Sequence, residues 1–137
     1  MENIERQNAK IKSVILGYED HGILTCMVHL EYDGGGQGFG GYCLDEWDEK
    51  EKQRIGTAYG LGWIIKLLKT LEVDTIKKLE GLPVRVEASS SKVHRIGHYL
   101  KDQWFDPEVL RQFYQDKEQH NYKSITVNNP GGGGTKL

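Results

Sequence analysis

The chain has 137 residues, of which 37% are hydrophobic, 9% aromatic and 28% charged. This length and apolar share suffice for one folded domain with a hydrophobic core, which excludes a chain that is disordered throughout. Lysine and arginine number 18 against 20 aspartate and glutamate residues, for a formal charge of −2. This balance argues against bulk binding to DNA or RNA, because phosphate binding of that kind needs clustered cations.

The sequence also bears on the compartment. It contains no apolar run near the roughly 18 residues that a membrane-spanning helix needs. The N-terminal stretch, Met1–Lys12, is too polar and charged for a signal peptide. Cys26 and Cys43 form no CxxC pair, which favours reduced thiols over a disulfide scaffold. We therefore expect a cytoplasmic protein with no membrane contact.

Composition divides the chain into three parts. We expect residues 1–8 to form a flexible arm, residues 9–119 a single domain, and residues 120–137 a flexible tail that ends in four consecutive glycines and three further residues. Within the domain, apolar alternation predicts strands over 9–16, 23–32 and 37–44. The first two of these strands should pair as a hairpin. The charged stretch 45–54 is expected to be a solvated connection.

In the second half of the domain the spacing of the apolar residues changes. Thr57 is placed to cap a helix, and apolar residues then recur at spacings of three and four as far as Leu71. Two more strands follow over 82–88 and 92–100, and Pro107 suits the first position of a last helix. The order β-β-β-α-β-β-α predicts an α+β fold, an antiparallel sheet with helices packed on one face. Such a sheet leaves a face or edge uncovered, so we expect a homo-oligomer, most simply a dimer.

A glycine-rich segment matches G-x-G-x-x-G from Gly36 onward. A dinucleotide fingerprint needs a helix directly after it, whereas Tyr42 and its neighbours continue as a strand. The segment is interpreted as a glycine-rich hairpin. A ligand surface, on which Phe39 and Tyr42 would stack, is kept as the alternative.

Neither a metal site nor a catalytic site is indicated. His94 and His98 are four residues apart, but on a strand their positions lie roughly 13 Å apart, too far for one metal ion. Asp20 and His21 share a turn without a serine or cysteine nucleophile beside them. We therefore expect a non-catalytic protein that uses no metal and no cofactor.

Arginine and aromatic residues supply the candidate binding site. Arg85 and Arg95 lie on the two strands of the second expected hairpin, and Tyr99 and Trp104 follow closely. Arginine beside aromatic rings can hold a phosphate and stack a base. These four residues therefore predict a nucleotide-sized pocket. In the structural alternative, Trp104 and Phe105 only anchor the last helix on the sheet.

Three blocks of the chain carry a family resemblance: YEDHGILTCMVHLEYDGGGQGFGGYCLD, RIGTAYGLGWIIKLLKTLEVD and KVHRIGHYLKDQWFDP. Together they resemble a family of small proteins encoded in phages and prophages, which supplies no catalytic residues to carry over. By size, phage-like character and an α+β plan with basic and aromatic residues, the chain is also similar to the Thoeris anti-defence proteins. Those proteins are sponges that sequester a cyclic ADP-ribose signal.

These resemblances imply a phage protein that works in the cytoplasm of a bacterial host cell. The first hypothesis is a non-catalytic anti-defence protein that sequesters a nucleotide-like small molecule, in a pocket at a subunit interface. The second is an inhibitor that binds a host defence protein, a nuclease or a CRISPR effector, through the sheet edge and the acidic run from Asp45. The third is an accessory factor of phage DNA replication or recombination, against which the missing basic stripe counts.

Overall fold

A computed structural model describes residues 3–128 of the chain, with side chains described as far as Gln119. Six antiparallel strands form one sheet in the order β3-β2-β1-β6-β7-β8, and two further strands form a separate hairpin. The strands are β1 (Glu5–Asp20), β2 (Ile23–Tyr32), β3 (Gly35–Gly40), β4 (Asp45–Asp48), β5 (Gln53–Gly56), β6 (Pro83–Ala88), β7 (Val93–His98) and β8 (Trp104–Phe105). The helices are α1 (Ala58–Leu71), α2 (Pro107–Asn128) and the short 3-10 helix η1 (Lys77–Leu79). The expected α+β class is confirmed.

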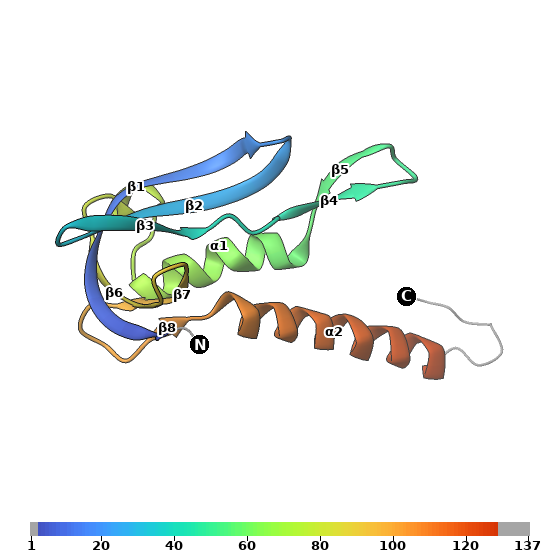
Figure 1. The fold of residues 1–137 in the computed structure, drawn as a ribbon. Coiled ribbons are helices and arrows are strands. Elements are labelled where there is room, and N and C mark those ends of the chain that lie inside the picture. The colour runs from blue at the N-terminus through green and yellow to red at the C-terminus, as the bar shows by residue number, and fades with distance from the viewer. Residues whose placement is uncertain (1–2, 129–137) are drawn as a thin grey trace.

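Strand β1 joins the two halves of the sheet. Its first residues, 5–10, pair with β6, and the rest of the strand pairs with β2. A register shift between Ile11 and Ser13 marks a bulge, and a bulge bends a strand and increases its twist. Figure 1 shows β1 curving around one end of the molecule. The flexible arm expected over 1–8 is therefore wrong for residues 5–8, which belong to the sheet.

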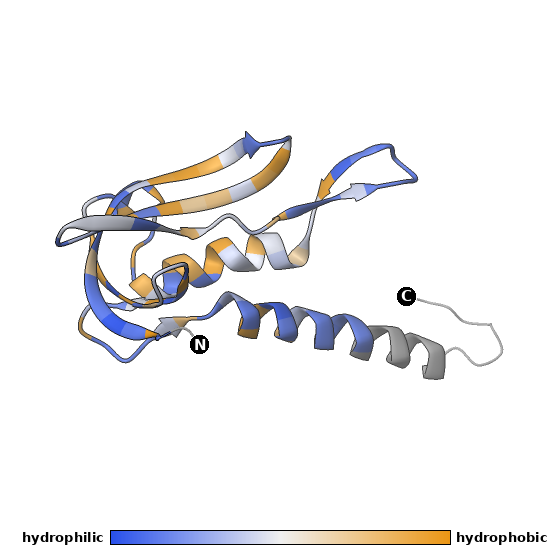
Figure 2. Ribbon diagram, viewed as in Figure 1, coloured by the Kyte–Doolittle hydropathy of each residue, from blue (hydrophilic) through white to orange (hydrophobic). Residues whose placement is uncertain are grey.

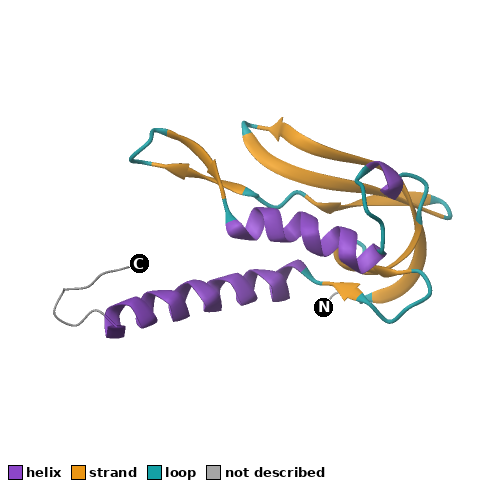
Figure 3. Cartoon of the chain, turned by 180° about the vertical axis from the view of Figure 1, so that it is seen from behind, coloured by secondary structure: helices purple, strands orange, loops and turns teal. Residues whose placement is uncertain are grey.

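Helix α1 lies inside the curve of the sheet, with α2 on its other side (Figures 1 and 3). Trp63 of α1 is fully buried, and its ring packs against Phe39 at 5.6 Å and Phe105 at 5.1 Å between centroids. Rings of this size dominate the energy of a core, and offset-stacked and edge-on contacts suit their quadrupoles. Apolar residues are concentrated on the strands and α1, whereas α2 is mostly hydrophilic (Figure 2).

The start of α1 follows the sequence prediction. Thr57 Oγ1 accepts a hydrogen bond from the Gly60 amide at 2.9 Å and donates one to the Leu44 carbonyl at 2.9 Å. A side chain at Gly60 would collide with that carbonyl oxygen, and one at Gly62 would collide with the Tyr114 ring. The two glycines therefore let α1 approach the preceding loop and α2 closely.

Two boundary predictions need correction. The stretch 45–54 is not a simple connection, because β4 and β5 pair there and the carboxylate of Asp48 accepts the Lys50 and Glu51 amides at 2.9 Å to close the turn. The third strand ends at Gly40, not at residue 44, because Gly40 and Gly41 both have positive φ.

Helix α2 continues past the point where the tail was expected to begin, since it runs to Asn128. Residues 129–137 of the expected tail lie outside the described residues. No helix in the described part of the chain is both long enough and apolar enough to cross a membrane.

Candidate functional site

The candidate site lies on the outer face of β6, β7 and β8. Val84 and Val86 of β6 are fully buried, so Arg85 and Glu87 alternate to the opposite face. Across the sheet, Gly97 of β7 stands between Arg85 and Trp104 in register. A Cβ atom added to Gly97 would lie 2.6 Å from the Trp104 ring. The indole therefore lies flat over Gly97, where a larger residue would displace it.

Three guanidinium groups surround this indole. The Cζ atoms of Arg6, Arg85 and Arg95 lie 4.6, 5.0 and 5.2 Å from the centroid of the Trp104 ring. All three distances are within the roughly 6 Å over which a cation is attracted to an aromatic ring. We call Arg6, Arg85, Glu87, Arg95 and Trp104 the arginine–tryptophan cluster. Its members come from β1, β6, β7 and β8, so the cluster forms only when the sheet is complete.

Arg85 is fixed by the backbone. Its Nε donates to the His98 carbonyl at 2.9 Å, and its Nη2 donates to the Lys101 carbonyl at 2.7 Å. The Trp104 indole N–H donates to the Asp102 carboxylate at 3.0 Å. These contacts hold the segment between β7 and β8 in place. Two of the five N–H donors of Arg85 are therefore bound to the backbone, which fixes its guanidinium beside the indole.

Arg6 and Arg95 are held differently, because they share one carboxylate. Arg6 donates from Nη2 at 2.6 Å and from Nε at 3.1 Å to Glu87 Oε2, and Arg95 Nε donates to Glu87 Oε1 at 2.8 Å. The side chains of Arg6 and Arg95 are 50% and 35% exposed, against 17% for Glu87. Both arginines therefore remain accessible from solvent.

The charges of the cluster do not balance. Partial burial raises the pKa of Glu87, but hydrogen bonds from Arg6 and Arg95 outweigh burial and leave that pKa below its ordinary value. Glu87 is consequently ionised at neutral pH. The two carboxylates at the cluster, those of Glu87 and of Asp102 beside the indole N–H, are outnumbered by three guanidinium groups. A guanidinium presents a planar fork of donors that matches two oxygens of a phosphate or carboxylate. The cluster can therefore hold an anion beside an aromatic ring.

The structure brings three of the predicted site residues together: Arg85, Arg95 and Trp104. Tyr99 lies just after the end of β7 and is 41% exposed. Its role as a stacking residue stays a prediction.

The prediction that Phe39 stacks a ligand is wrong. The Phe39 side chain is fully buried, and its ring contacts Trp63 and Phe105 in the core. Tyr42 also lies apart from the cluster, since its ring is 6.2 Å from Trp63 and 5.9 Å from the guanidinium of Arg111 on α2. The glycine-rich segment pairs with β2 as strand β3, which confirms the interpretation as a hairpin.

Sequence reasoning missed Arg6 and Glu87. Arg6 was assigned to the flexible arm, although it continues the alternation set by the buried residues Ala9 and Ile11. Extending that alternation toward the N-terminus would have placed Arg6 on the outer face of the sheet. Glu87 lies two residues after Arg85 and therefore on the same face of β6.

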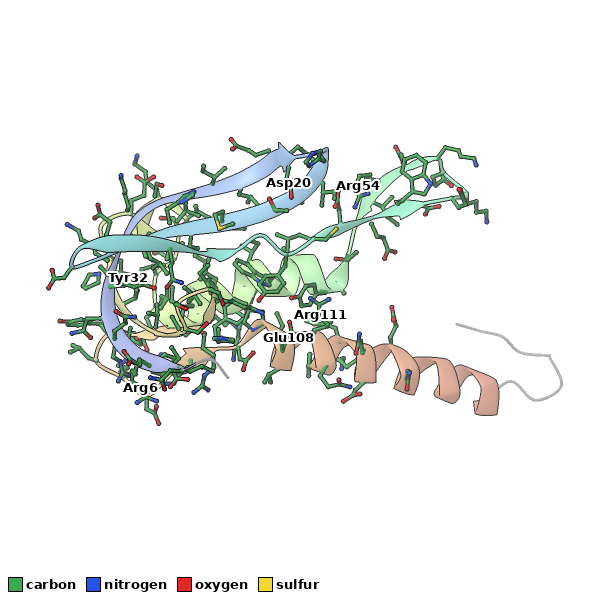
Figure 4. The ribbon with its side chains drawn as sticks, viewed as in Figure 1. Arg6, Asp20, Tyr32, Arg54, Glu108 and Arg111 are labelled. Carbon is green, nitrogen blue, oxygen red and sulfur yellow. The ribbon has the colours of Figure 1, made fainter. Side chains whose placement is uncertain are left out.

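A cavity of about 520 Å³ lies elsewhere, between the base of the β4–β5 hairpin, the start of α1 and helix α2. Arg111 stands at this cavity, over the Tyr59 ring at 5.1 Å and 3.5 Å from Glu108 (Figure 4). Burial raises the pKa of Tyr59 to about 12, so its hydroxyl stays neutral. Glu46 and Glu118 offset the cations Arg111 and Lys117 that line the cavity. We assign the anion site to the arginine–tryptophan cluster because guanidiniums outnumber carboxylates there, whereas the charges that line this cavity leave no excess of cations.

Among residues with described side chains, no three His, Cys, Asp or Glu residues gather where they could hold a metal ion. No protein-family model, curated protein or solved structure matches the chain, so its function must be argued from the geometry of this site.

Proposed function

We propose that the protein is a non-catalytic phage anti-defence protein that binds and sequesters a nucleotide-derived immune signal such as cyclic ADP-ribose. One observation carries the proposal: two solvent-accessible guanidiniums, those of Arg6 and Arg95, lie beside an indole that a third arginine supports. Sequestration requires no bond to break, because tight binding alone lowers the free concentration of the signal.

The chemistry of such a signal fits the cluster. Cyclic ADP-ribose carries two linked phosphates and a purine. Guanidinium forks bind phosphate oxygens in pairs, and charge-assisted hydrogen bonds are about twice as strong as neutral ones. The exposed Tyr99 offers a ring for the base, and stacking on an aromatic ring contributes roughly 1–3 kcal/mol per base. The Trp104 indole lies between Gly97 and the guanidiniums and holds them in place.

A second copy of the chain would complete this proposal, since we expect the binding pocket at a subunit interface. Leu61 and Ile65 of α1 are 65% and 44% exposed, and Val109 and Phe113 of α2 are 66% and 51% exposed. Each pair is spaced i, i+4, which gives each helix an uncovered apolar strip. Light scattering over a wide concentration range should return at least twice the monomer mass. A constant monomer mass would contradict the homo-oligomer.

The proposed function is tested by calorimetric titration of the purified protein. The ligands are cyclic ADP-ribose isomers, with cyclic oligonucleotides as a second class of phosphate-bearing signal. We expect saturable binding of at least one cyclic ADP-ribose isomer, with the ligand recovered chemically unchanged. If the protein binds none of these ligands, the proposal is contradicted and a protein target is favoured.

The β4–β5 hairpin supports a second candidate function, inhibition of a host nuclease or CRISPR effector. The hairpin projects from the rest of the molecule in Figure 1, and Trp47 on it is 52% exposed. Exposed tryptophans are frequent anchors of protein interfaces. In this case Trp47→Ala would abolish inhibition of a purified effector and leave nucleotide binding unchanged.

A further inference from the structure

We propose that Glu87 is an internal competitor of the ligand and that it makes the arginine–tryptophan cluster selective for two linked phosphates. The inference deepens the proposed function and rests on it. Glu87 occupies the position between Arg6 and Arg95 that a phosphate group would take, so binding replaces one anion by another. The ligand class it specifies is a nucleotide with a diphosphate bridge.

The first step is geometric. Arg6, Glu87 and Arg95 are direct neighbours in register across β1, β6 and β7. Neighbouring strands lie about 4.8 Å apart, so the two arginines start roughly 10 Å apart with the carboxylate midway between them. Each oxygen of Glu87 serves a different arginine, Oε2 for Arg6 and Oε1 for Arg95. A phosphate group with two free oxygens can make the same pair of contacts.

The second step concerns which arginines can exchange partners. Arg85 donates to two backbone carbonyls, which are fixed by the fold and cannot leave. Arg6 and Arg95 instead share a side-chain carboxylate, which can rotate away from them. They therefore carry the ligand, and Arg85 acts as a positioning residue that supports the indole. This assignment gives the charge of the ligand to Arg6 and Arg95, whereas the sequence predicts Arg85 and Arg95 for that role.

The third step is a comparison of charges. A ligand with one negative charge, such as a cyclic nucleotide monophosphate, would only replace the single charge of Glu87 and would gain little. A diphosphate brings two negative charges, one for each of the two exchangeable guanidiniums. An ionised Glu87 therefore weakens the binding of every anionic ligand. It weakens the binding of a singly charged ligand enough to exclude that ligand from the cluster. Removing its charge should strengthen binding and reduce this selectivity.

The test is calorimetric titration of wild type and Glu87→Gln with ADP-ribose and with 3′,5′-cyclic AMP. Glutamine keeps the shape of the side chain and one acceptor oxygen but removes the charge. We expect Glu87→Gln to bind ADP-ribose about tenfold more tightly than wild type does. The affinity for cyclic AMP should rise by a larger factor, so that the ratio of the affinities for ADP-ribose and cyclic AMP becomes smaller.

Glu31→Gln is the matched control, because it removes the same charge from an exposed residue of β2. It should leave both affinities unchanged. Glu87→Ala, checked for folding by its melting temperature, should shift both affinities in the same direction as Glu87→Gln.

The outcomes separate the two proposals. If wild type binds ADP-ribose or a cyclic ADP-ribose isomer and Glu87→Gln binds it equally or more weakly, the role of Glu87 is refuted and the proposed function stands. If neither protein binds any of these probes, the proposed function fails and the inference fails with it.

Discussion

Two carboxylates of this protein, Asp45 and Glu87, each hold arginine, and the comparison separates a structural ion pair from a candidate binding site. The Asp45 side chain is 3% exposed and accepts hydrogen bonds from Arg54 at 2.8 and 2.9 Å and from the Leu24 amide at 3.1 Å. Glu87 is more exposed and stands between two arginines. In Figure 4 the labelled Arg54 and Arg6 lie far apart.

The difference lies in the ratio of charges. Asp45 has one arginine, and hydrogen bonds from Arg54 hold its pKa below the ordinary value despite burial. That pair is saturated and joins β5 to the start of β2. At Glu87 the cations outnumber the carboxylate, so the cluster favours a ligand that carries more negative charge than the Glu87 side chain it replaces. A burial pattern alone does not distinguish these cases, whereas counting charges does.

Removal of Asp45 should give the largest effect on stability. Asp45→Ala leaves the Leu24 amide and the partly buried Arg54 without their acceptor, and hydrogen bonds to a charged group contribute roughly 1.5–3 kcal/mol each. We expect the free energy of unfolding to fall by about 3 kcal/mol, as measured by urea denaturation. Affinity for ADP-ribose should not change in the folded fraction. A loss of affinity would show that the two sites are coupled.

In contrast to Asp45→Ala, Arg95→Ala should weaken ligand binding and leave stability almost unchanged. It removes one exchangeable guanidinium, so a charge-assisted contact worth roughly 1.5–3 kcal/mol is lost and ligand binding weakens about 10- to 150-fold. Stability should change by less than about 1 kcal/mol, because Glu87 keeps Arg6 and the Arg95 side chain is 35% exposed. Arg111→Ala is the matched control and should bind as wild type does. Unchanged affinity in Arg95→Ala would mean that Arg95 only pairs with Glu87.

Gly97→Ala tests whether the indole must lie on β7. The added Cβ would stand 2.6 Å from the ring, so Trp104 has to leave its place on Gly97 and its contacts with the three guanidiniums change. Overpacking of this kind costs about 1–3 kcal/mol. We expect a lower melting temperature together with weaker ADP-ribose binding. Wild-type affinity in a destabilised Gly97→Ala would show that the position of the indole does not matter for binding.

Part of the cluster could be predicted from the sequence because it depends on local pattern. Strand alternation and the short turn between the two strands predict that Arg85 and Arg95 lie on one hairpin. The structure confirms that β6 pairs with β7. Arg6 is 81 residues from Glu87 along the chain, and its partner depends on the pairing of β1 with β6. A local pattern predicts the two strands of a hairpin as neighbours, but it does not specify that strands as far apart in the chain as β1 and β6 pair.

The aromatic residues of the glycine-rich segment show a second limit. The sequence keeps open the alternative that Phe39 lies at a ligand surface, because glycines surround it. Those glycines instead allow close approach of backbone to backbone, since a side chain at Gly36 or Gly40 would collide with the carbonyl of Leu30 or Cys26. The tight packing buries Phe39 under Trp63. Whether a glycine makes room for a ligand or for a neighbouring strand depends on the tertiary structure.

The smallest expected effect is on the pH dependence of stability. The pKa of Glu87 is lowered in the folded state, from an ordinary value of 4.5. A lowered pKa stabilises the fold at pH values above the ordinary one, and this stabilisation is lost as the pH falls through the folded value. Asp45 has the same sign of shift, from 3.8.

The free energy of unfolding of wild type should therefore decrease as the pH falls below about 4.5. In Glu87→Gln this decrease should be smaller by up to about 1 kcal/mol, a limit set by the exposure of Arg6 and Arg95. Urea denaturation of both proteins, at a series of pH values from neutral into the acidic range in which Glu87 is protonated, measures this difference in the free energy of unfolding. Because Asp45 still titrates in Glu87→Gln, some acid sensitivity must remain. An equal dependence of the free energy of unfolding on pH in the two proteins would mean that the arginines stabilise the ionised Glu87 no better in the folded chain than water does in the unfolded one. In that case a phosphate would replace Glu87 at almost no cost in free energy.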